Sequence, residues 1–203
     1  MAFSGLIAGL GNPGAEYRNT RHNFGFMAIE RLLRESAETK GRLPAKLSGN
    51  RDNFELWKAD FGEGDTASAE WLLLKPLTFM NGSGEAVLAV SSYYRINSWR
   101  ILIVHDELDL PPGRMKMKKG GGSAGHKGIQ SIEHRLGTAD FFRLRLGIGK
   151  PEQGRALSHV LEPFAAAELE TVEKCLSAAL HSMLLFIRTG AAAAQQFCNS
   201  FSL

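Results

Sequence analysis

The chain has 203 residues, 44% of them hydrophobic, which predicts a single folded domain over residues 1–203 with a sizeable core. Its formal net charge of +3 permits an anionic partner without requiring one. The two cysteines stand far apart and the most apolar stretch, 176–187, is too short to cross a bilayer, so we expect a cytoplasmic protein rather than a disulfide-stabilised or membrane one.

Short apolar runs bounded by Gly, Pro or Asn alternate along the chain with stretches of helical spacing. The predicted strands are Gly5–Ala8, Phe54–Ala59, Trp71–Leu74, Ile101–Val104 and Leu144–Ile148. The predicted helices are Phe24–Arg34, Gly84–Ile96, Lys127–Leu136 and Ala165–Arg188, with Ala191–Ala194 in a final helix. The stretch Leu43–Asn53 is polar and without pattern, so we predict a loop there. This alternation predicts an α/β sandwich.

The first predicted strand runs into GLGNPG at residues 9–14, which has the glycine spacing of a dinucleotide-binding loop. In that loop a helix begins within the glycines, and an acidic residue about 20 positions on ends the next strand. Here residues 15–23 are polar and aperiodic, and Glu30 and Glu35 fall inside the predicted helix. A dinucleotide-dependent oxidoreductase is therefore disfavoured. We predict instead a tight turn that presents Asn12 at a sheet edge, with ordinary turn chemistry as the alternative.

His22 precedes the first predicted helix, and its ordinary pKa near 6.5 suits proton transfer at neutral pH. A lone histidine there is more often a capping residue, so a partner is needed. The stretch ILIVHDELDL at 101–110 supplies a candidate in Asp106, since a carboxylate at a strand end can fix one imidazole tautomer. These acids also suit a solvated turn. Without a Gly-x-Ser-x-Gly nucleophile, such a pair would activate water; no metal-ligand spacing occurs, so we predict no metal.

Positive charge gathers in two later segments. As a strand, GRMKMKK at 113–119 would place Arg114, Lys116 and Lys118 on one face and the methionines on the other. FRLRL at 142–146 repeats the pattern, and glycine-rich residues 120–125 lie between the two. Together they predict a phosphate-binding surface beside a flexible loop, with a solvated sheet face as the alternative.

Six segments in this order resemble bacterial-type peptidyl-tRNA hydrolase: GLGNPG (9–14), TRHNFG (20–25), LKPLTFMNGSGEAV (74–87), HDELDLPPG (105–113), GGGSAGHKG (120–128) and FRLRLGIGKP (142–151). Each is weak alone, but the set is specific. The resemblance implies a single-domain three-layer sandwich, a mixed twisted sheet flanked by helices, that needs no cofactor and acts as a monomer. It also implies an esterase whose partner is peptidyl-tRNA: it cleaves the bond between the peptide and the terminal ribose, which recycles the tRNA.

The resemblance also implies roles for individual residues. His22 matches the general base that activates water, and Asp106 matches the carboxylate that orients it. The residues that match substrate contacts are Asn12, Tyr17, Met80, Asn81, His126 and Lys127, of which Asn81 would bond the peptide main chain. Lys118 and Arg145 match a clamp on the tRNA 5′-phosphate.

The chain departs from the family at Lys127, where many members have asparagine in Gly-His-Asn-Gly. A lysine cannot accept a hydrogen bond, but it can contact a phosphate or the terminal ribose. The departure leaves open a second hypothesis, a non-catalytic RNA-binding protein on the same scaffold. The presence of Asn12, His22, Asn81 and Asp106 favours the hydrolase.

Overall fold

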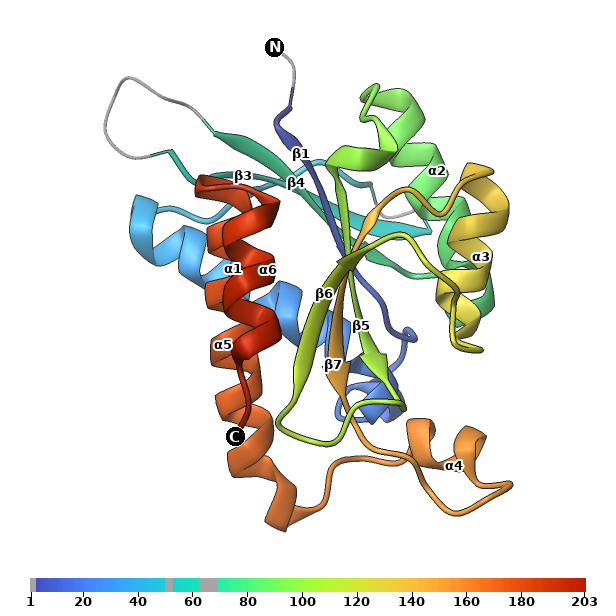
Figure 1. The fold of residues 1–203 in the computed structure, drawn as a ribbon. Helices are drawn as coiled ribbons and strands as arrows, with labels where there is room; N and C mark the ends of the chain where they lie inside the picture. The colour runs from blue at the N-terminus through green and yellow to red at the C-terminus, as the bar shows by residue number, and fades with distance from the viewer. Residues whose placement is uncertain (1–2, 50–52, 63–68) are drawn as a thin grey trace.

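The computed structural model describes residues 3–49, 53–62 and 69–203. Its strands are β1 (Gly5–Gly9), β2 (Ala45–Lys46), β3 (Phe54–Asp60), β4 (Glu70–Pro76), β5 (Ile101–Glu107), β6 (Met115–Lys119) and β7 (Phe142–Gly147). They form one seven-stranded sheet in the order β2-β3-β4-β1-β5-β7-β6 (Figure 1). The strands from β4 to β7 in this order run parallel, whereas β2, β3 and β6 are antiparallel to their neighbours. The predicted α/β fold with a mixed sheet is confirmed.

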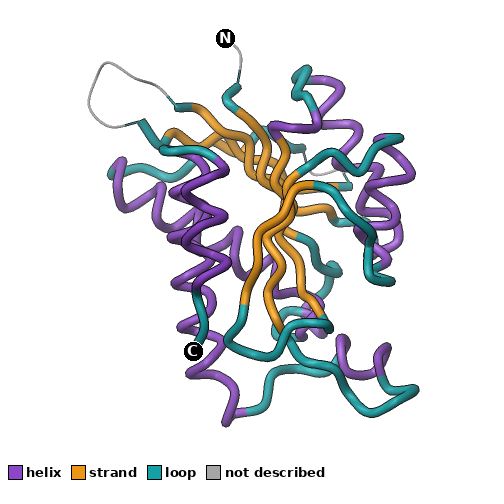
Figure 2. Tube along the Cα trace, viewed as in Figure 1, coloured by secondary structure: helices purple, strands orange, loops and turns teal. Residues whose placement is uncertain are grey.

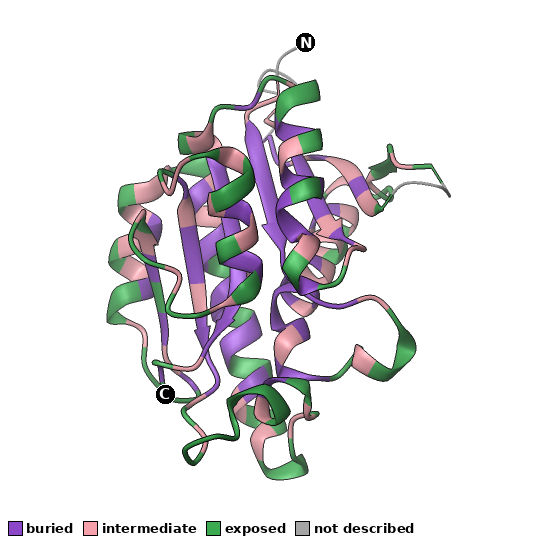
Figure 3. Ribbon diagram, turned by 90° about the vertical axis from the view of Figure 1, so that its right-hand side faces the viewer, coloured by how far each residue is buried: buried purple, intermediate pink, exposed green. Residues whose placement is uncertain are grey.

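Helices cover both faces of the sheet and make three layers (Figure 2). The helices are α1 (Phe24–Lys40), α2 (Ser83–Tyr93), α3 (Lys127–Leu136), α4 (Ala156–Leu161), α5 (Leu169–Arg188) and α6 (Ala191–Ser200). One hydrophobic core joins the sheet to α1, α5 and α6, and a second joins its opposite face to α2 and α3. Strands β1 and β5 are buried along their whole length between these layers (Figure 3).

The order of the strands creates a natural binding position at the carboxyl end of β1. The chain leaves β1 through α1, on one face, to reach β4, and passes through α2, on the other face, to β5 on the far side of β1. Ligands of open α/β sheets bind outside the carboxyl ends of the strands where the order reverses in this way. The segment after β1 and the end of β5 meet at this edge, and they carry Asn12, His22 and Asp106.

Two short elements were not expected. We predicted a loop over Leu43–Asn53, but the structure has the strand β2 within it, so the prediction is wrong there. Residues 50–52 of this stretch lie outside the described residues. Both side chains of β2 are exposed, so no burial pattern marks the strand, and it exists through its pairing with Trp57 and Lys58 of β3. Helix α4 is equally unmarked because five of its six residues, Ala156–His159 and Leu161, are exposed or partly exposed.

Several predicted boundaries also need correction. Helix α1 continues past Arg34 to Lys40, β7 begins at Phe142 rather than Leu144, and α5 begins at Leu169, after a 3₁₀ turn, rather than at Ala165. Helix α2 stops at Tyr93 instead of Ile96 because Arg95 adopts the left-handed region, with φ 55°. The N–H of Ile96 then bonds the carbonyl of Ser91, which closes the helix end.

The C-terminal segment covers the edge strand β6. Asn199 of α6 accepts the N–H of Met117 at 2.9 Å and donates to its carbonyl at 3.3 Å, as a neighbouring strand would. Arg114 donates to the carbonyls of Asn199 and Phe201, so its predicted place on a free basic face is wrong. The described part of the chain contains no helix that is both long and apolar enough to span a membrane.

Candidate active site

The GLGNPG turn and the TRHNFG segment pack together through contacts that only small residues allow. A Cβ at Gly9 would lie 2.2 Å from the carbonyl oxygen of Gly25, so α1 begins directly against the end of β1. Asn23 then holds the turn, because its Oδ1 accepts the N–H of Asn12 at 2.7 Å and its Nδ2 donates to the Asn12 carbonyl at 3.0 Å. These contacts fix the backbone on both sides of His22 at the carboxyl edge of the sheet.

His22 meets Asp106 across this edge. Its Nδ1 lies 2.9 Å from Oδ1 of Asp106, whose side chain is 1% exposed. Burial by itself raises the pKa of Asp106, but the imidazoles of His22 and His126 and their hydrogen bonds outweigh burial and hold that pKa far below its usual range. Asp106 is therefore ionised, and it accepts the Nδ1 proton of His22. This leaves the lone pair of His22 Nε2 available to take a proton from water.

His126 shares the same carboxylate oxygen. Its Nδ1 accepts the N–H of Ile129 at 3.4 Å, which caps α3. The proton of the neutral ring is therefore on Nε2, which lies 3.1 Å from Oδ1 of Asp106 and donates to it. Two imidazole N–H groups thus satisfy one buried oxygen. His126 in this way ties the start of α3 to the end of β5.

A third histidine, His105, lies behind this pair. Its Nδ1 donates to the backbone carbonyl of Asp106 at 2.7 Å, and its ring packs edge-on against His126 at 4.7 Å between centroids. Burial and the neighbouring His126 lower the pKa of His105 well below its usual value, so this ring is neutral at physiological pH. His105 thus helps to hold the backbone of Asp106 and the ring of His126 in place.

Three of these side chains also offer metal-ligand atoms. Nitrogen and oxygen atoms of His22, Asp106 and His126 lie within 4.8 Å of one another, a donor set that zinc accepts. Their hydrogen bonds already account for this proximity, since a metal at His126 Nε2 would displace the proton that the Ile129 bond places there. The expectation of no metal site stays a prediction.

These groups open onto a cleft of ≈ 330 Å³ between the start of α3 and α4. Its ionisable lining residues are His22, Asp106, Glu107, His126 and Lys127, and its remaining wall is made of Leu108, Ala124, Gly125, Ala156, Leu157 and Val160. Neither serine, threonine nor cysteine is among these described lining residues. The chemistry that the cleft supports is therefore attack by an activated water rather than by a side-chain hydroxyl or thiol.

Arg21 holds the α4 wall against the site. Its side chain is 8% exposed, and it donates to the carbonyls of Glu162 at 3.3 Å and Pro163 at 3.1 Å and to the carboxylate of Glu168 at 2.8 Å. These bonds tie the residue before His22 to the segment between α4 and α5. The wall formed by α4 is thus fixed to the same turn as the histidine.

Asn12 and Met80, both expected as substrate contacts, are joined directly. Oδ1 of Asn12 accepts the N–H of Met80 at 2.9 Å, which leaves the amide Nδ2 of Asn12 as a donor for another group. Met80 in turn packs on Gly128, where a Cβ would lie 2.6 Å from its sulfur. Because Gly128 follows closely after His126, this contact links the Asn12 turn to the histidine cluster.

The other expected substrate contacts lie near Met80. Tyr17 packs edge-on against the exposed Phe79, with 6.3 Å between ring centroids. Asn81 is exposed, and the described residues offer its side chain no hydrogen bond. Tyr17 and Phe79 can therefore contact an apolar group, and the side chain of Asn81 can bind a peptide amide.

Lys118 and Arg145 lie on one face of the β6–β7 pair. Nε of Arg145 donates to Oε2 of Glu107 at 2.8 Å, and Glu107 is the residue after Asp106. The register pairs Lys116 with Arg145, so Lys118 lies two residues along on the same face. Burial, together with the charge of Arg145, lowers the pKa of Lys118. The terminal nitrogens of Arg145 make no hydrogen bond within the described residues and can donate to a phosphate.

Arg143 does not join this basic surface. It is 1% exposed, pairs with Glu133 of α3 at 2.6 Å and donates to the carbonyl of Gly122 at 3.0 Å. The predicted phosphate-binding surface therefore does not include Arg143. Arg143 instead fastens α3 and the glycine-rich segment to the sheet.

Sequence reasoning missed the residues that hold the site together. Arg21, Asn23 and Glu107 act through backbone carbonyls, amides and a buried ion pair, and none of these contacts has a signature in spacing. Phe79 carried one signal, since it is an aromatic residue beside Met80 in a segment that the resemblance covers. Its exposure next to Tyr17 identifies it as a further candidate contact.

Comparisons with known proteins agree with this architecture. The family model described as peptidyl-tRNA hydrolase matches residues 6–203. Peptidyl-tRNA hydrolase of Nitratidesulfovibrio vulgaris strain DP4 is 50% identical over 202 residues, which cover 99% of both chains. That of Oleidesulfovibrio alaskensis is 49% identical over 98% of both chains. A crystal structure of peptidyl-tRNA hydrolase from Acinetobacter baumannii is 34% identical, covers 100% of this chain and 98% of its own, and superposes with a TM-score of 0.85.

A mixed α/β sheet with a histidine-carboxylate pair at its strand-order reversal is the architecture of an α/β enzyme whose site suits acid–base chemistry. The family model matches nearly the whole chain, from residue 6 to residue 203, and this extent shows the family. The chain belongs to the peptidyl-tRNA hydrolase family.

Proposed function

We propose that this protein hydrolyses the ester between a peptide, or an N-blocked aminoacyl group, and the terminal ribose of tRNA. Membership of the peptidyl-tRNA hydrolase family supports the substrate and the reaction. The observation that carries the mechanism is the 2.9 Å hydrogen bond from His22 to the buried Asp106, in a cleft whose described lining residues include no serine, threonine or cysteine.

In the proposed reaction, Nε2 of His22 takes a proton from water as the water oxygen attacks the ester carbonyl. Asp106 stabilises the imidazolium that forms, as a buried carboxylate does in hydrolytic triads. The carbon–oxygen bond to the ribose then breaks, and the proton on His22 goes to the leaving ribose oxygen. The products are a free peptide carboxylate and tRNA with a free terminal hydroxyl.

Substrate binding is divided among three groups of residues in this proposal. Asn81 and the donor Nδ2 of Asn12 bind the peptide main chain, while Tyr17, Phe79 and Met80 contact its side chains. His126 orients Asp106 from α3. Lys118 and Arg145 bind a tRNA phosphate, in keeping with their clustered charge and the lowered pKa of Lys118.

We further propose that the active form is a cytoplasmic monomer. One cleft already combines the proposed base, its carboxylate and a cation, which supports this proposal. Sedimentation equilibrium at micromolar concentration should give the mass of one chain; a dimer would overturn the proposal.

The test of the function compares N-acetyl-aminoacyl-tRNA with the same aminoacyl-tRNA left unacetylated. We expect fast release of the blocked amino acid and slow release of the free one, because a charged ammonium lacks the amide carbonyl that the Nδ2 donors of Asn12 and Asn81 would bind. The alternative, a non-catalytic RNA-binding protein, is not favoured by the family match. Salt-sensitive tRNA binding without any hydrolysis would restore it.

A further inference from the structure

Lys127 occupies an unusual position in the cleft. It is the first residue of α3 and directly follows His126, which hydrogen-bonds to Asp106. Its exposed side chain lines the same cleft as His22. The hydrogen bond from His126 to Asp106 fixes the backbone immediately before it. The backbone of Lys127 is therefore held near the proposed base, and its side chain can reach into the same cleft.

Internal pairing separates Lys127 from most other lysines. Seven of the ten lysines form ion pairs with carboxylates of the chain: Lys40, Lys46, Lys58, Lys75, Lys119, Lys150 and Lys174. The three lysines for which the described residues supply no such partner are Lys116, Lys118 and Lys127. All three flank the segment 120–126 that leads from β6 to α3. One of the three, Lys127, lines the cleft, and the other two lie on β6.

Helix stability does not explain a lysine at this position. The N-terminus of a helix carries partial positive charge, so a cation in the first turn is unfavourable by roughly 0.3–1 kcal/mol unless an anion balances it. The first turn of α3 contains no acidic residue. An anionic ligand in the cleft would offset this cost.

We propose that Lys127 binds the 5′-phosphate group of the terminal nucleotide, the one whose ribose carries the ester. This inference rests on the proposed function and names the subsite that Lys127 serves. In such a substrate a single ribose joins the ester oxygen to its nearest phosphate. A cation that contacts this phosphate must therefore share the cleft with the base that acts on the ester, as Lys127 and His22 do.

Two small esters test this subsite directly: 3′-O-(N-acetylaminoacyl)adenosine and the same ester with a 5′-phosphate. We expect the wild-type kcat/KM to be about tenfold higher for the phosphorylated ester, the size of one charge-assisted contact. In Lys127→Ala this ratio falls toward one, whereas Lys127→Arg, which keeps the charge, retains most of it. Lys174→Ala, which changes an exposed lysine in the first half of α5, is the matched control and keeps the wild-type ratio.

On N-acetyl-aminoacyl-tRNA, the same contact predicts a change in salt dependence. Loss of one phosphate contact to a single-stranded end lowers the slope of log kcat/KM against log salt by about 0.7 in Lys127→Ala. This readout does not depend on how well the small esters bind.

The outcomes distinguish this inference from the proposed function. If wild type cleaves N-acetyl-aminoacyl-tRNA but Lys127→Ala keeps the ester ratio, the phosphate subsite is wrong and the function stands. Equal losses on both esters would place Lys127 on the ester itself and also overturn the subsite. If wild type cleaves no blocked ester at all, the proposed function fails and the subsite fails with it.

Discussion

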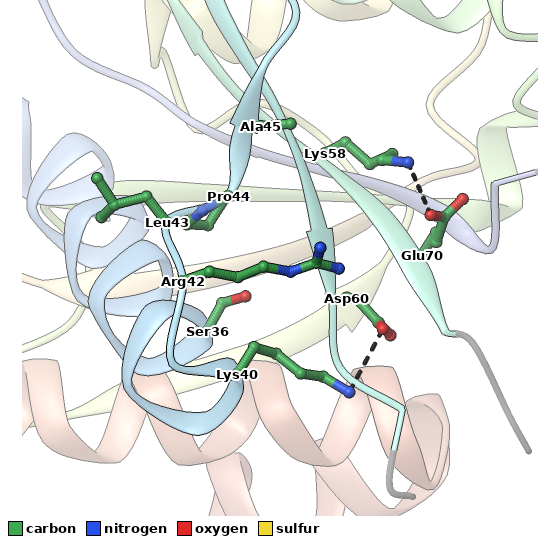
Figure 4. Close-up of a pocket in the computed structure, with 9 residues that line it drawn as sticks. All are labelled: Ser36, Lys40, Arg42, Leu43, Pro44, Ala45, Lys58, Asp60 and Glu70. Atoms are coloured by element: carbon green, nitrogen blue, oxygen red, sulfur yellow. Dashed lines mark ion pairs between the residues drawn. The ribbon is translucent and has the colours of Figure 1, made fainter. Parts of the chain in front are cut away.

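Two hollows on the surface of this protein differ in whether their lysines are paired. At the β2 edge of the sheet, a hollow of ≈ 180 Å³ lies between the end of α1 and strands β2, β3 and β4 (Figure 4). Its lysines are neutralised by the chain itself, since Lys40 pairs with Asp60 at 3.3 Å and Lys58 with Glu70 at 2.9 Å. In the cleft of His22 the lysine has no partner, and the buried carboxylate instead polarises two imidazoles.

The difference shows which features of a hollow indicate function. Ion pairs closed within the chain contribute little stability at a surface and leave their charge unavailable to a ligand. A base whose free nitrogen faces a cleft, next to an unpaired cation, can still accept a proton and bind an anion from a ligand. The predictions below test this contrast, beginning where the effect is largest.

Replacement of His22 by alanine should abolish hydrolysis of N-acetyl-aminoacyl-tRNA. Loss of a general base lowers kcat by about 10²–10⁴-fold. Binding of tRNA should persist because the basic surface is untouched, and a filter-binding assay measures it. His134→Ala, an exposed histidine on α3, serves as control and keeps wild-type turnover. Unchanged turnover in His22→Ala would remove His22 as the base.

Asp106→Asn should lower kcat by about 10²-fold, because the amide cannot stabilise the imidazolium and offers His22 a donor where an acceptor is needed. Single-turnover kinetics isolate this step from product release. A fall in kcat/KM caused by a higher KM alone would contradict the orienting role.

The same variant changes acid stability in a direction set by the lowered pKa of Asp106. Above a pH of about 3.9, the carboxyl is ionised in both the folded and the unfolded chain, and its stabilising contribution is full. Below that pH the unfolded chain takes up a proton that the folded one does not, so stability falls with a slope of about 1.4 kcal/mol per pH unit. Urea unfolding from pH 5 to 2 should give a shallower loss in Asp106→Asn than in wild type. Parallel curves would refute the ionised, buried state.

Sequence was a good guide to the central sheet and a poor one to its margins. Strands β1 and β5 are buried on both faces, so their sequences are continuous apolar runs that predict strands directly. Strand β2 and helix α4 depend on contacts made by other segments, and their exposed side chains carry no pattern. The position of Arg143 was predicted wrongly because the alternating pattern of FRLRL does not distinguish a buried arginine from an exposed one.

The site shows the same limit. His22 and Asp106 could be selected by chemistry, but 84 residues of chain separate them, and only the sheet topology brings them to one edge. Asn23 and Arg21 lie beside His22 in sequence, yet their hydrogen bonds to Asn12 and to the α4 segment depend on tertiary contacts. Sequence thus suggested the reacting groups, while the groups that hold them were visible only in the fold.

Arg145→Ala should raise KM for N-acetyl-aminoacyl-tRNA by about tenfold with little change in kcat, since a charge-assisted phosphate contact supports binding rather than chemistry. Glu107→Gln should have a smaller effect of the same kind, because Glu107 orients Arg145 through its Nε. Arg135→Ala, an exposed arginine on α3, is the control. A loss in kcat without a change in KM would place Arg145 in the chemical step.

The smallest effects are expected in the hollow at the β2 edge. Lys40→Ala removes an ion pair whose side chains are 22% and 26% exposed, and it should lower the free energy of unfolding by about 0–1 kcal/mol. The carboxylate of Asp60 still accepts a hydrogen bond from the N–H of Gly62 at 2.9 Å, so it is not left without a partner. Hydrolysis and its salt dependence should match wild type. A KM raised by Lys40→Ala would mean that RNA reaches this edge, and that an internally paired lysine can still serve a ligand.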